Sequence, residues 1–408
     1  MGSTSDRYLV ISVDGHAGAD LRDYKPYLAS TWHDEFDAWA DAYVNPWGDL
    51  VDPDANRNWN TERRLRELDG DGVVAEVLYP NTIPPFFPSG NLLAPLPSRA
   101  EYERRWAGIQ AHNRWLADFC AEAPGRRAGI AQILVHDVDD AVAETRWAVE
   151  HGLTGGIMLP GVPPGHVEVA PLWSDDYEPL WQTCAELDVT MNHHAGGGIP
   201  PFAMDAASRA ILLIELPIYG HRALWALIFA GVFERHPQLR FVLTEQGTGW
   251  VPGGLASLDW FYGRMKKETH PEHLFGGEAV AKMSLTPSEY FARNCWIGAS
   301  FLRPAECDVR HLIGIDRIMW GADYPHNEGS VPHTLEALQV TFANVPDEEC
   351  RLMFGLTAAD VYHFDLGLLA PLADRLGPRV EDVHRPLEAW PEGTTCGAFD
   401  DNPIVRSW

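Results

Sequence analysis

The sequence predicts an α/β protein: a distorted (β/α)8 barrel with long loops after its strands and a C-terminal extension. Three observations predict this fold. Eight short apolar, β-rich runs recur along the 408 residues, and stretches of helical periodicity separate them. No Gly-x-Gly-x-x-Gly motif or phosphate loop follows the first run, which disfavours the alternative of an open doubly wound sheet. Alternating strands and helices imply parallel βαβ units, because a parallel strand needs a crossover, and eight such units close a barrel.

Each expected strand is a short run of β-branched, aromatic and other apolar residues, and each expected helix is a longer amphipathic stretch. The strands are expected at 8–13, 73–79, 129–135, 155–159, 189–192, 239–244, 296–300 and 317–320. The helices are expected at 61–68, 99–121, 138–151, 177–187, 206–235, 305–312 and 333–343.

Long connections follow four of the expected strands, at 17–60, 80–97, 161–174 and 195–206. In a barrel such loops lie over the mouth formed by the carboxyl ends of the strands, where substrate is held. Their aromatic residues are candidates to wall a substrate: Trp47, Trp59, Phe86, Phe87 and Phe202. We expect residues 1–364 to form the catalytic barrel and residues 365–408, rich in proline, to form an extended arm on the barrel or on a neighbouring subunit.

Composition excludes several classes of function. The net charge of −27 repels polyanions, so nucleic acid and anionic membranes are poor partners. The longest nearly apolar run, from Ala223 to Phe233, is far shorter than the ~20 residues that cross a bilayer. No secretory signal is recognisable near the N-terminus, and the six cysteines include no Cys-x-x-Cys pair. We therefore expect a cytoplasmic protein with free thiols and a small-molecule substrate.

Acidic and imidazole side chains stand at the ends of four expected strands. Asp14 and His16 are two residues apart and so share a face of the first strand. One of the adjacent pair His193 and His194 faces inward from the fifth, Glu245 follows the sixth, and Asp323 follows the eighth. Three to five nitrogen and oxygen ligands from separate elements form a divalent-metal site. The sequence therefore predicts such a site at the barrel mouth.

Five motifs together resemble the amidohydrolase-related family, which includes aminocarboxymuconate-semialdehyde decarboxylase and related metal-dependent hydrolases. They are Ile11-Ser-Val-Asp-Gly-His16, Asn192-His-His-Ala-Gly-Gly-Gly198, Gly231-Val-Phe-Glu-Arg-His-Pro237, Leu243-Thr-Glu-Gln-Gly-Thr-Gly-Trp250 and Gly321-Ala-Asp-Tyr-Pro-His326. The resemblance extends in register from about Tyr8 to Phe364 and implies a distorted barrel with one or two metal ions at its mouth.

The resemblance assigns metal ligands by position. Asp14 and His16 match the ligand pair of the first strand, which in many relatives is His-x-His. His194 matches the ligand of the fifth strand, Glu245 stands where many members have histidine, and Asp323 matches the aspartate of the eighth. Exchanging imidazoles for carboxylates hardens the ligand set, which shifts the expected metal from zinc toward manganese or iron.

Further residues are candidates for the same site. Glu76, within the second strand, is a possible extra ligand because a buried carboxylate is costly unless it is paired or bound to metal. His221 is a second possible ligand, and Glu215 and His112 share that uncertainty. We expect Asp323 to act catalytically by binding metal or taking a proton, and His326 to orient the site or shuttle protons.

The expected function is that of a metal-dependent hydrolase or a non-oxidative decarboxylase acting on a small organic substrate. One alternative is a dinuclear iron or manganese/iron oxygenase, if Glu76 or His221 completes a second metal position. Another alternative is a non-catalytic partner subunit, because the C-terminal arm could bind another chain. We expect a homodimer, or a hetero-oligomer with a related barrel subunit.

Overall fold

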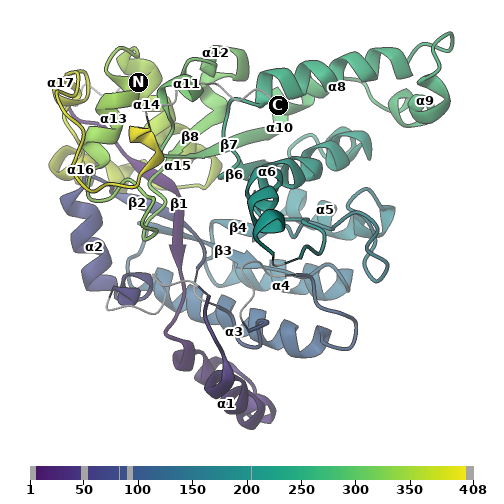
Figure 1. Ribbon diagram of the computed structural model, residues 1–408, viewed down its shortest axis with the longest axis horizontal. Coiled ribbons are helices and arrows are strands. Elements are labelled where there is room, and N and C mark those ends of the chain that lie inside the picture. Colours follow the sequence, from purple (N-terminus) through teal and green to yellow (C-terminus); the bar gives the residue numbers. More distant parts are fainter. Residues whose placement is uncertain (1–5, 47–53, 82, 90–94, 204, 401–408) are drawn as a thin grey trace.

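A computed structural model describes residues 6–46, 54–81, 83–89, 95–203 and 205–400, and its centre is a sheet of eight parallel strands ringed by helices (Figure 1). The strands pair in chain order from first to last. They are β1 (Ile11–Ala17), β2 (Ala75–Pro80), β3 (Arg127–Gln132), β4 (Gly156–Met158), β5 (Met191–His194), β6 (Phe241–Thr244), β7 (Cys295–Ser300) and β8 (Ile318–Gly321). Every expected strand is present, and the α/β barrel prediction is confirmed.

The barrel closes between β1 and β8, and the closure is irregular. Gly15 forms an isolated parallel bridge with Tyr324, and the His16 amide donates to the Tyr324 carbonyl at 2.7 Å. The Ala322 amide donates to the Ser12 hydroxyl at 2.8 Å. On its other side β1 shifts register against β2 between Ser12 and Gly15. Such a bulge bends a strand and redirects its side chains, so the distortion falls where the predicted ligands begin.

The helices of the outer ring begin at capping residues encoded in the sequence. Asp137 accepts hydrogen bonds from the amides of Asp139 and Asp140 at the start of α4, and a Thr286–Glu289 capping box begins α10. Each such cap stabilises a helix by about 1 kcal/mol. The helices that cover the strands are α2 (Thr61–Gly70), α3 (Tyr102–Ala121), α4 (Val138–Glu150), α5 (Glu178–Glu186), α6 (Ala206–Phe229), α7 (Val232–Arg235), α8 (Val251–Met265), α9 (His273–Ala281), α10 (Pro287–Asn294), α11 (Pro304–Cys307), α12 (Arg310–Ile313) and α13 (Thr334–Phe342).

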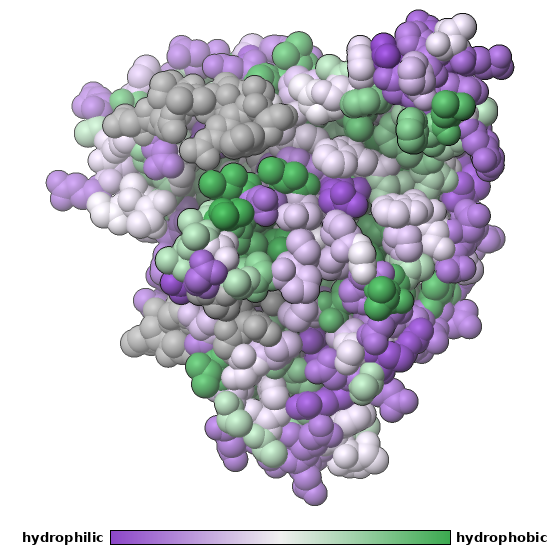
Figure 2. Space-filling model, turned by 45° about the vertical axis from the view of Figure 1, so that its right-hand side comes forward, coloured by the Kyte–Doolittle hydropathy of each residue, from purple (hydrophilic) through white to green (hydrophobic). Residues whose placement is uncertain are grey.

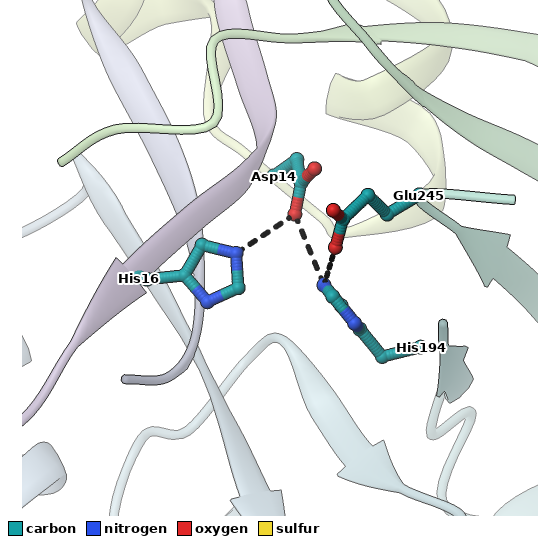
Figure 3. A group of neighbouring side chains, drawn as sticks. All are labelled: Asp14, His16, His194 and Glu245. Atoms are coloured by element: carbon teal, nitrogen blue, oxygen red, sulfur yellow. Dashed lines mark hydrogen bonds and ion pairs between the residues drawn. The ribbon is translucent and has the colours of Figure 1, made fainter. Parts of the chain in front are cut away.

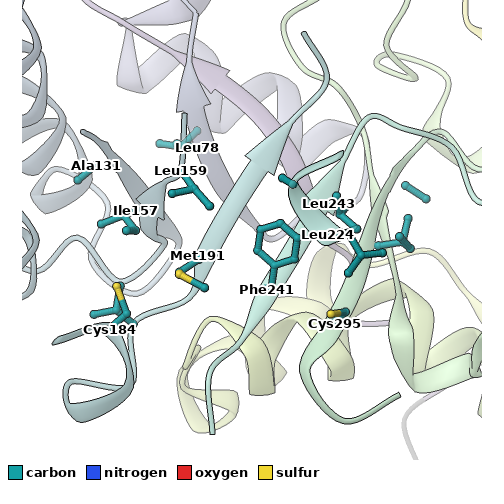
Figure 4. Packing of buried hydrophobic residues seen from close by; sticks show 14 of the residues in the cluster. Leu78, Ala131, Ile157, Leu159, Cys184, Met191, Leu224, Phe241, Leu243 and Cys295 are labelled. Carbon is teal, nitrogen blue, oxygen red and sulfur yellow. The ribbon is translucent and has the colours of Figure 1, made fainter. Parts of the chain in front are cut away.

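Two hydrophobic layers hold the barrel together. The larger fills the space between strands and helices and includes Leu78, Met191, Leu224 and Phe241 (Figure 4). The smaller lies inside the barrel below the mouth and joins alternate residues of the strands, such as Val13 and Val77, to α15 (Thr357–Val361) and α16 (Leu366–Leu376). Both faces of the strands are therefore buried, as is usual for parallel sheets.

Several helices were not expected from the sequence. Helix α1 (His33–Ala42) lies within the long connection after β1 and projects from the barrel at the bottom of Figure 1. Helices α8, α9 and α10 fill the connection between β6 and β7, and α8 and α9 project at the upper right. The single helix expected at 206–235 is divided into α6 and α7 by Gly231, whose φ of 70° is left-handed and ends a helix.

The segment after residue 364 is partly helical rather than extended, and it lies on the barrel of its own chain. Leu369 of α16 belongs to the same hydrophobic cluster as the strands. The Tyr8 amide donates to the Pro378 carbonyl, and the Val380 amide to the Asp6 carbonyl, both at 2.9 Å. Helices α14 (Asp347–Arg351) and α17 (Val380–Val383) complete this end of the molecule.

Within the described residues, only helix α6 is long and apolar enough to cross a membrane, and less than half of its most apolar stretch is buried inside the protein. Uninterrupted apolar runs in the sequence do not reveal this helix, because Glu215, His221 and Arg222 divide it. The six cysteines are all buried free thiols, as expected.

Candidate metal centre

Four of the predicted ligands converge at the carboxyl ends of β1, β5 and β6 (Figure 3). Asp14 Oδ1 lies 3.2 Å from His16 Nε2 and 3.4 Å from His194 Nε2. Glu245 Oε2 approaches the same His194 nitrogen to 3.2 Å. One ligand atom from each residue falls within 4.8 Å of the others. The residues come from positions up to 231 apart in the chain, and the barrel alone brings them together.

A second group shares His16 and adds the two residues predicted to be catalytic. His16 Nε2 lies 3.4 Å from Asp323 Oδ1, and His326 Nδ1 lies 2.7 Å from the same oxygen. The His326 ring also packs against the His16 ring with centroids 4.2 Å apart. His326 therefore contacts a candidate ligand directly and has the geometry of a positioning residue.

Backbone conformation directs two of these side chains. Glu245 and Asp323 both have φ of 57°, a left-handed conformation that costs free energy in residues other than glycine. Gly321, just before Asp323, allows β8 to approach β1 closely, because a Cβ there would stand 2.6 Å from the Asp14 Cβ. Strain and close approach concentrate at the mouth, which is typical of functional sites.

The electrostatics of the group follow from carboxylates and imidazoles sharing an enclosed space. Burial alone would raise the pKa of Asp14, but His16 and His194 hold it well below its usual range. Burial opposes a charged imidazole, yet the neighbouring carboxylates raise the pKa values of His16 and His194 to about 9. Burial and the charges of Asp323 and Asp14 raise the pKa of Glu245 to about 7. The site thus attracts positive charge.

The residues present fit a divalent cation. His16 Nε2 and Asp323 Oδ2 are buried atoms to which the described residues supply no hydrogen bond, and such atoms are costly unless something binds them. Three carboxylates and two imidazoles form the mixed oxygen and nitrogen donor set that manganese and iron accept readily. This geometry agrees with the predicted divalent-metal cofactor.

Two residues that the sequence did not predict, Tyr79 and Ser300, support the site. The Ser300 hydroxyl donates to Asp14 Oδ2, and the Tyr79 ring packs edge-on against His194 at 4.7 Å. In the sequence, these two residues are distinguished only by their positions at or near the ends of expected strands. They orient the ligands and occupy space around them, which is the usual role of residues behind a metal site.

A chain of amides behind His326 was also missed. Asn58 Nδ2 donates to the Ala55 carbonyl at 2.9 Å, so the Asn58 side-chain oxygen accepts from Asn81 Nδ2. The Asn81 oxygen then accepts from His326 Nε2 at 3.1 Å. This order of donors and acceptors places a proton on His326 Nε2 and leaves Nδ1 facing Asp323. Asn58 ends a short 3-10 helix and Asn81 directly follows β2, and neither position was distinguished by the sequence.

Glu76 is not part of the metal centre, which corrects the prediction that it is an extra ligand. Arg64 Nη2 lies 2.7 Å from Glu76 Oε2, and Arg64 Nε lies 2.8 Å from Oε1. Both side chains are buried, and burial would raise the pKa of Glu76, but Arg64 holds it below its usual value. The carboxylate points toward the helix layer, where Arg64 compensates it.

His221 likewise lies outside both groups of candidate ligands. Its ring stacks on Trp250 at 3.6 Å, and burial lowers its pKa to about 4. His193 packs toward the helix layer, as expected, with Nδ1 2.9 Å from the Leu159 carbonyl. His112 is buried against the Tyr24 hydroxyl, and Glu215 is exposed on α6.

Of the aromatic residues predicted to wall a substrate, Phe86 is buried in the large hydrophobic cluster, and Trp59, Phe87 and Phe202 are partly exposed. Trp47 lies outside the described residues.

The fold and the site define an enzyme of the amidohydrolase class, and the sequence match agrees: residues 51–364 match the family described as amidohydrolase. The chain belongs to this family. The predictions of the family, the barrel and an enzyme are therefore confirmed.

Among relatives, the chain is 27% identical over 280 residues to a gamma-resorcylate decarboxylase of Rhodococcus jostii, which covers 65% of this chain and 79% of the relative. A gamma-resorcylate decarboxylase of Rhizobium radiobacter is 25% identical over 275 residues, covering 65% and 76%.

Solved structures share the fold at lower identity. A 5-carboxyvanillate decarboxylase from Sphingomonas paucimobilis has a TM-score of 0.64 at 19% identity and covers 88% of this chain and all of the other. A dihydroxybenzoic acid decarboxylase from Polaromonas, with bound manganese and 2-nitroresorcinol, has a TM-score of 0.61 at 19% identity, covering 88% and 98%.

Proposed function

We propose that this protein is a manganese-dependent, non-oxidative decarboxylase of hydroxylated aromatic carboxylic acids. The observation that carries the proposal is the convergence of Asp14, His16, His194, Glu245 and Asp323 at one rim of the barrel. The relatives add support, since those named above are decarboxylases of gamma-resorcylate, dihydroxybenzoic acid or 5-carboxyvanillate. The six buried thiols fit a reducing compartment, and we infer a cytoplasmic location.

Asp14, His16, His194 and Asp323 would hold the ion, with Glu245 at its partly exposed side. A bound divalent ion supplies a Lewis acid that polarises and orients oxygen atoms of a substrate. Its carboxylate-rich ligand set favours manganese over zinc.

The reaction needs one proton and no oxidant. A proton must reach the ring carbon that bears the carboxylate, after which the carbon–carbon bond breaks, its electron pair returns to the ring and CO2 leaves. Asp323 is the group that delivers this proton, and His326 exchanges protons with it across the 2.7 Å contact. Asn81 fixes the His326 ring so that Nδ1 keeps facing the carboxylate.

The alternatives are less well supported. A dinuclear oxygenase required Glu76 or His221 as a further ligand, and Arg64 and Trp250 engage these side chains instead. A non-catalytic subunit is disfavoured because the ligand set has every member that the strand ends predicted. Hydrolysis of an ester or amide would also use a divalent ion as a Lewis acid, and the experiment below distinguishes it from decarboxylation.

The test is turnover by the full-length chain loaded with manganese. We expect loss of the substrate absorbance and release of CO2 from 2,6-dihydroxybenzoate or 5-carboxyvanillate, with no turnover of benzoate, which lacks hydroxyl groups. Asp323→Asn should reduce kcat by at least about 100-fold, the lower range for loss of a general acid. Asp316→Asn is the matched control, because this exposed carboxylate precedes β8 and pairs only with Arg317 among the described residues.

Manganese-loaded enzyme that leaves every hydroxybenzoate intact while hydrolysing an ester or amide would replace the decarboxylase with a hydrolase. Asp323→Asn with undiminished CO2 release would refute the role given to Asp323.

A further inference from the structure

Helix α6 exposes an apolar stripe along most of its length. The stripe consists of residues three, four or seven apart, which share one side of a helix: Ile211, Ile214, Ile218, Trp225 and Phe229. Ile211 and Ile214 are each 51% exposed, and the others are partly exposed. A largely apolar side on a surface helix is unusual in a monomer and marks a contact surface.

A surface cavity lies at the C-terminal end of the stripe. This cavity of about 390 Å³ lies beside the C-terminal half of α6, and its walls include Trp173, Trp225 and Phe229. Trp173 comes from the connection after β4 and is 56% exposed. Apolar residues also gather in the middle of the face shown in Figure 2 and at its upper right, where α8 and α9 project. The cavity offers a receptor for an apolar side chain from outside the molecule.

Two charged residues interrupt the stripe, and they have opposite signs. Glu215 and Arg222 are seven residues apart, two turns of helix, and so lie on the same side. The structure gives neither side chain an ion pair or hydrogen bond with the described residues. The stripe is therefore neutral, on a chain whose net charge is −27.

We propose that two copies of this chain associate through their α6 stripes. A two-fold axis between Ile218 and Tyr219 makes the helices antiparallel and sets Glu215 of each copy against Arg222 of the other. The same arrangement brings Ile211 of one copy opposite Ala226, at the cavity of the other. An isologous contact needs a self-complementary surface, and this pattern of charges is self-complementary.

The charges favour a second copy over other occupants. An anionic membrane would be repelled by a chain of this net charge, and a membrane offers nothing that pairs with both Glu215 and Arg222. A copy of the chain presents both partners at once, and because of the symmetry the pair between Glu215 and Arg222 forms twice.

The test exchanges the charges. Sedimentation velocity over a range of concentrations measures the dimer dissociation constant of the full-length chain. Glu215→Arg places like charges opposite each other at two sites, and so does Arg222→Glu, so each should weaken dimerisation by about 100-fold or more. The double variant Glu215→Arg with Arg222→Glu restores opposite charges and should return to within about tenfold of the native value. Glu388→Arg, the same charge change at an exposed position outside α6, is the control.

Thermal unfolding of each variant separates a lost contact from a lost fold. A native chain that is monomeric at all concentrations would overturn the proposal, as would single variants that dimerise normally. Weakened single variants without recovery in the double variant would refute the antiparallel pairing. Dimers that persist in the α6 variants but dissociate on Phe275→Ser would move the interface to α9, where Phe275 is 91% exposed. Cosedimentation of the native chain with phosphatidylglycerol vesicles would assign the stripe to a membrane instead.

Discussion

Replacing Glu76 with glutamine should destabilise the protein without removing its metal. Glu76 and Arg64 are both buried, with exposed side-chain fractions of 2% and 0%, and make three hydrogen-bond contacts of 2.7 to 3.0 Å. Glutamine keeps the shape but leaves the Arg64 charge without its buried partner. Removing one member of a buried ion pair costs about 3–5 kcal/mol.

The expected shift in melting temperature follows from the size of the chain. Unfolding entropy of about 2.1 cal/mol/K per residue gives about 0.9 kcal/mol/K for 408 residues, so the melting temperature should fall by about 3–6 °C. Differential scanning calorimetry of the metal-free protein measures the fall, and elemental analysis of the metal-loaded protein measures binding.

Glu144→Gln is the matched control, because this buried carboxylate pairs with Arg114 on the helix layer. It too should lower the melting temperature and leave metal binding unchanged. Loss of bound metal in Glu76→Gln but not in Glu144→Gln would show that Glu76 is a ligand after all. An unchanged melting temperature would refute the energetic reasoning.

Three further predictions concern the site and its surroundings. Asp14→Asn should weaken manganese binding by more than about 10-fold, as titration of the metal-free protein would measure, because the carboxylate contacts both His16 and His194. Asn81→Ala should lower kcat by about 10- to 100-fold with little change in KM, because His326 loses its acceptor; an unchanged kcat would remove Asn81 from the site. Burial raises the pKa of Asp71 from its usual 3.8 to about 7. The unfolded chain therefore releases this proton first as pH rises, and the free energy of unfolding should fall by up to about 4 kcal/mol between pH 4 and pH 7. Denaturant unfolding of Asp71→Asn should lack this part of the pH dependence, and an identical profile in both proteins would contradict the assignment.

The residues of the candidate site could be predicted from the sequence because a parallel barrel places the carboxyl ends of all its strands at one rim. Asp14, His16, His194, Glu245 and Asp323 each follow or end an apolar run, so strand order alone brings them together. Their backbone conformations could not be predicted, because the left-handed conformations of Glu245 and Asp323 depend on neighbouring strands that hold them.

Glu76 shows why the second strand misled the prediction. Ala75, Val77 and Tyr79 face the barrel interior, while Leu78 packs in the layer toward the helices. Since both faces are apolar and buried, the pattern of β2 does not tell which face carries Glu76. Arg64, whose ion pair orients Glu76 toward the helix layer, lies on α2, twelve positions earlier. Its side chain reaches Glu76 only in the folded protein.

The sequence by itself determined the alternation of strands and helices, the barrel and the side chains at its rim, because periodicity and chain order are local properties. Tertiary structure alone decided which buried carboxylate binds an arginine, which asparagines orient His326, and which side of α6 remains uncovered. These depend on contacts between residues far apart in the chain, and periodicity carries no information about such contacts.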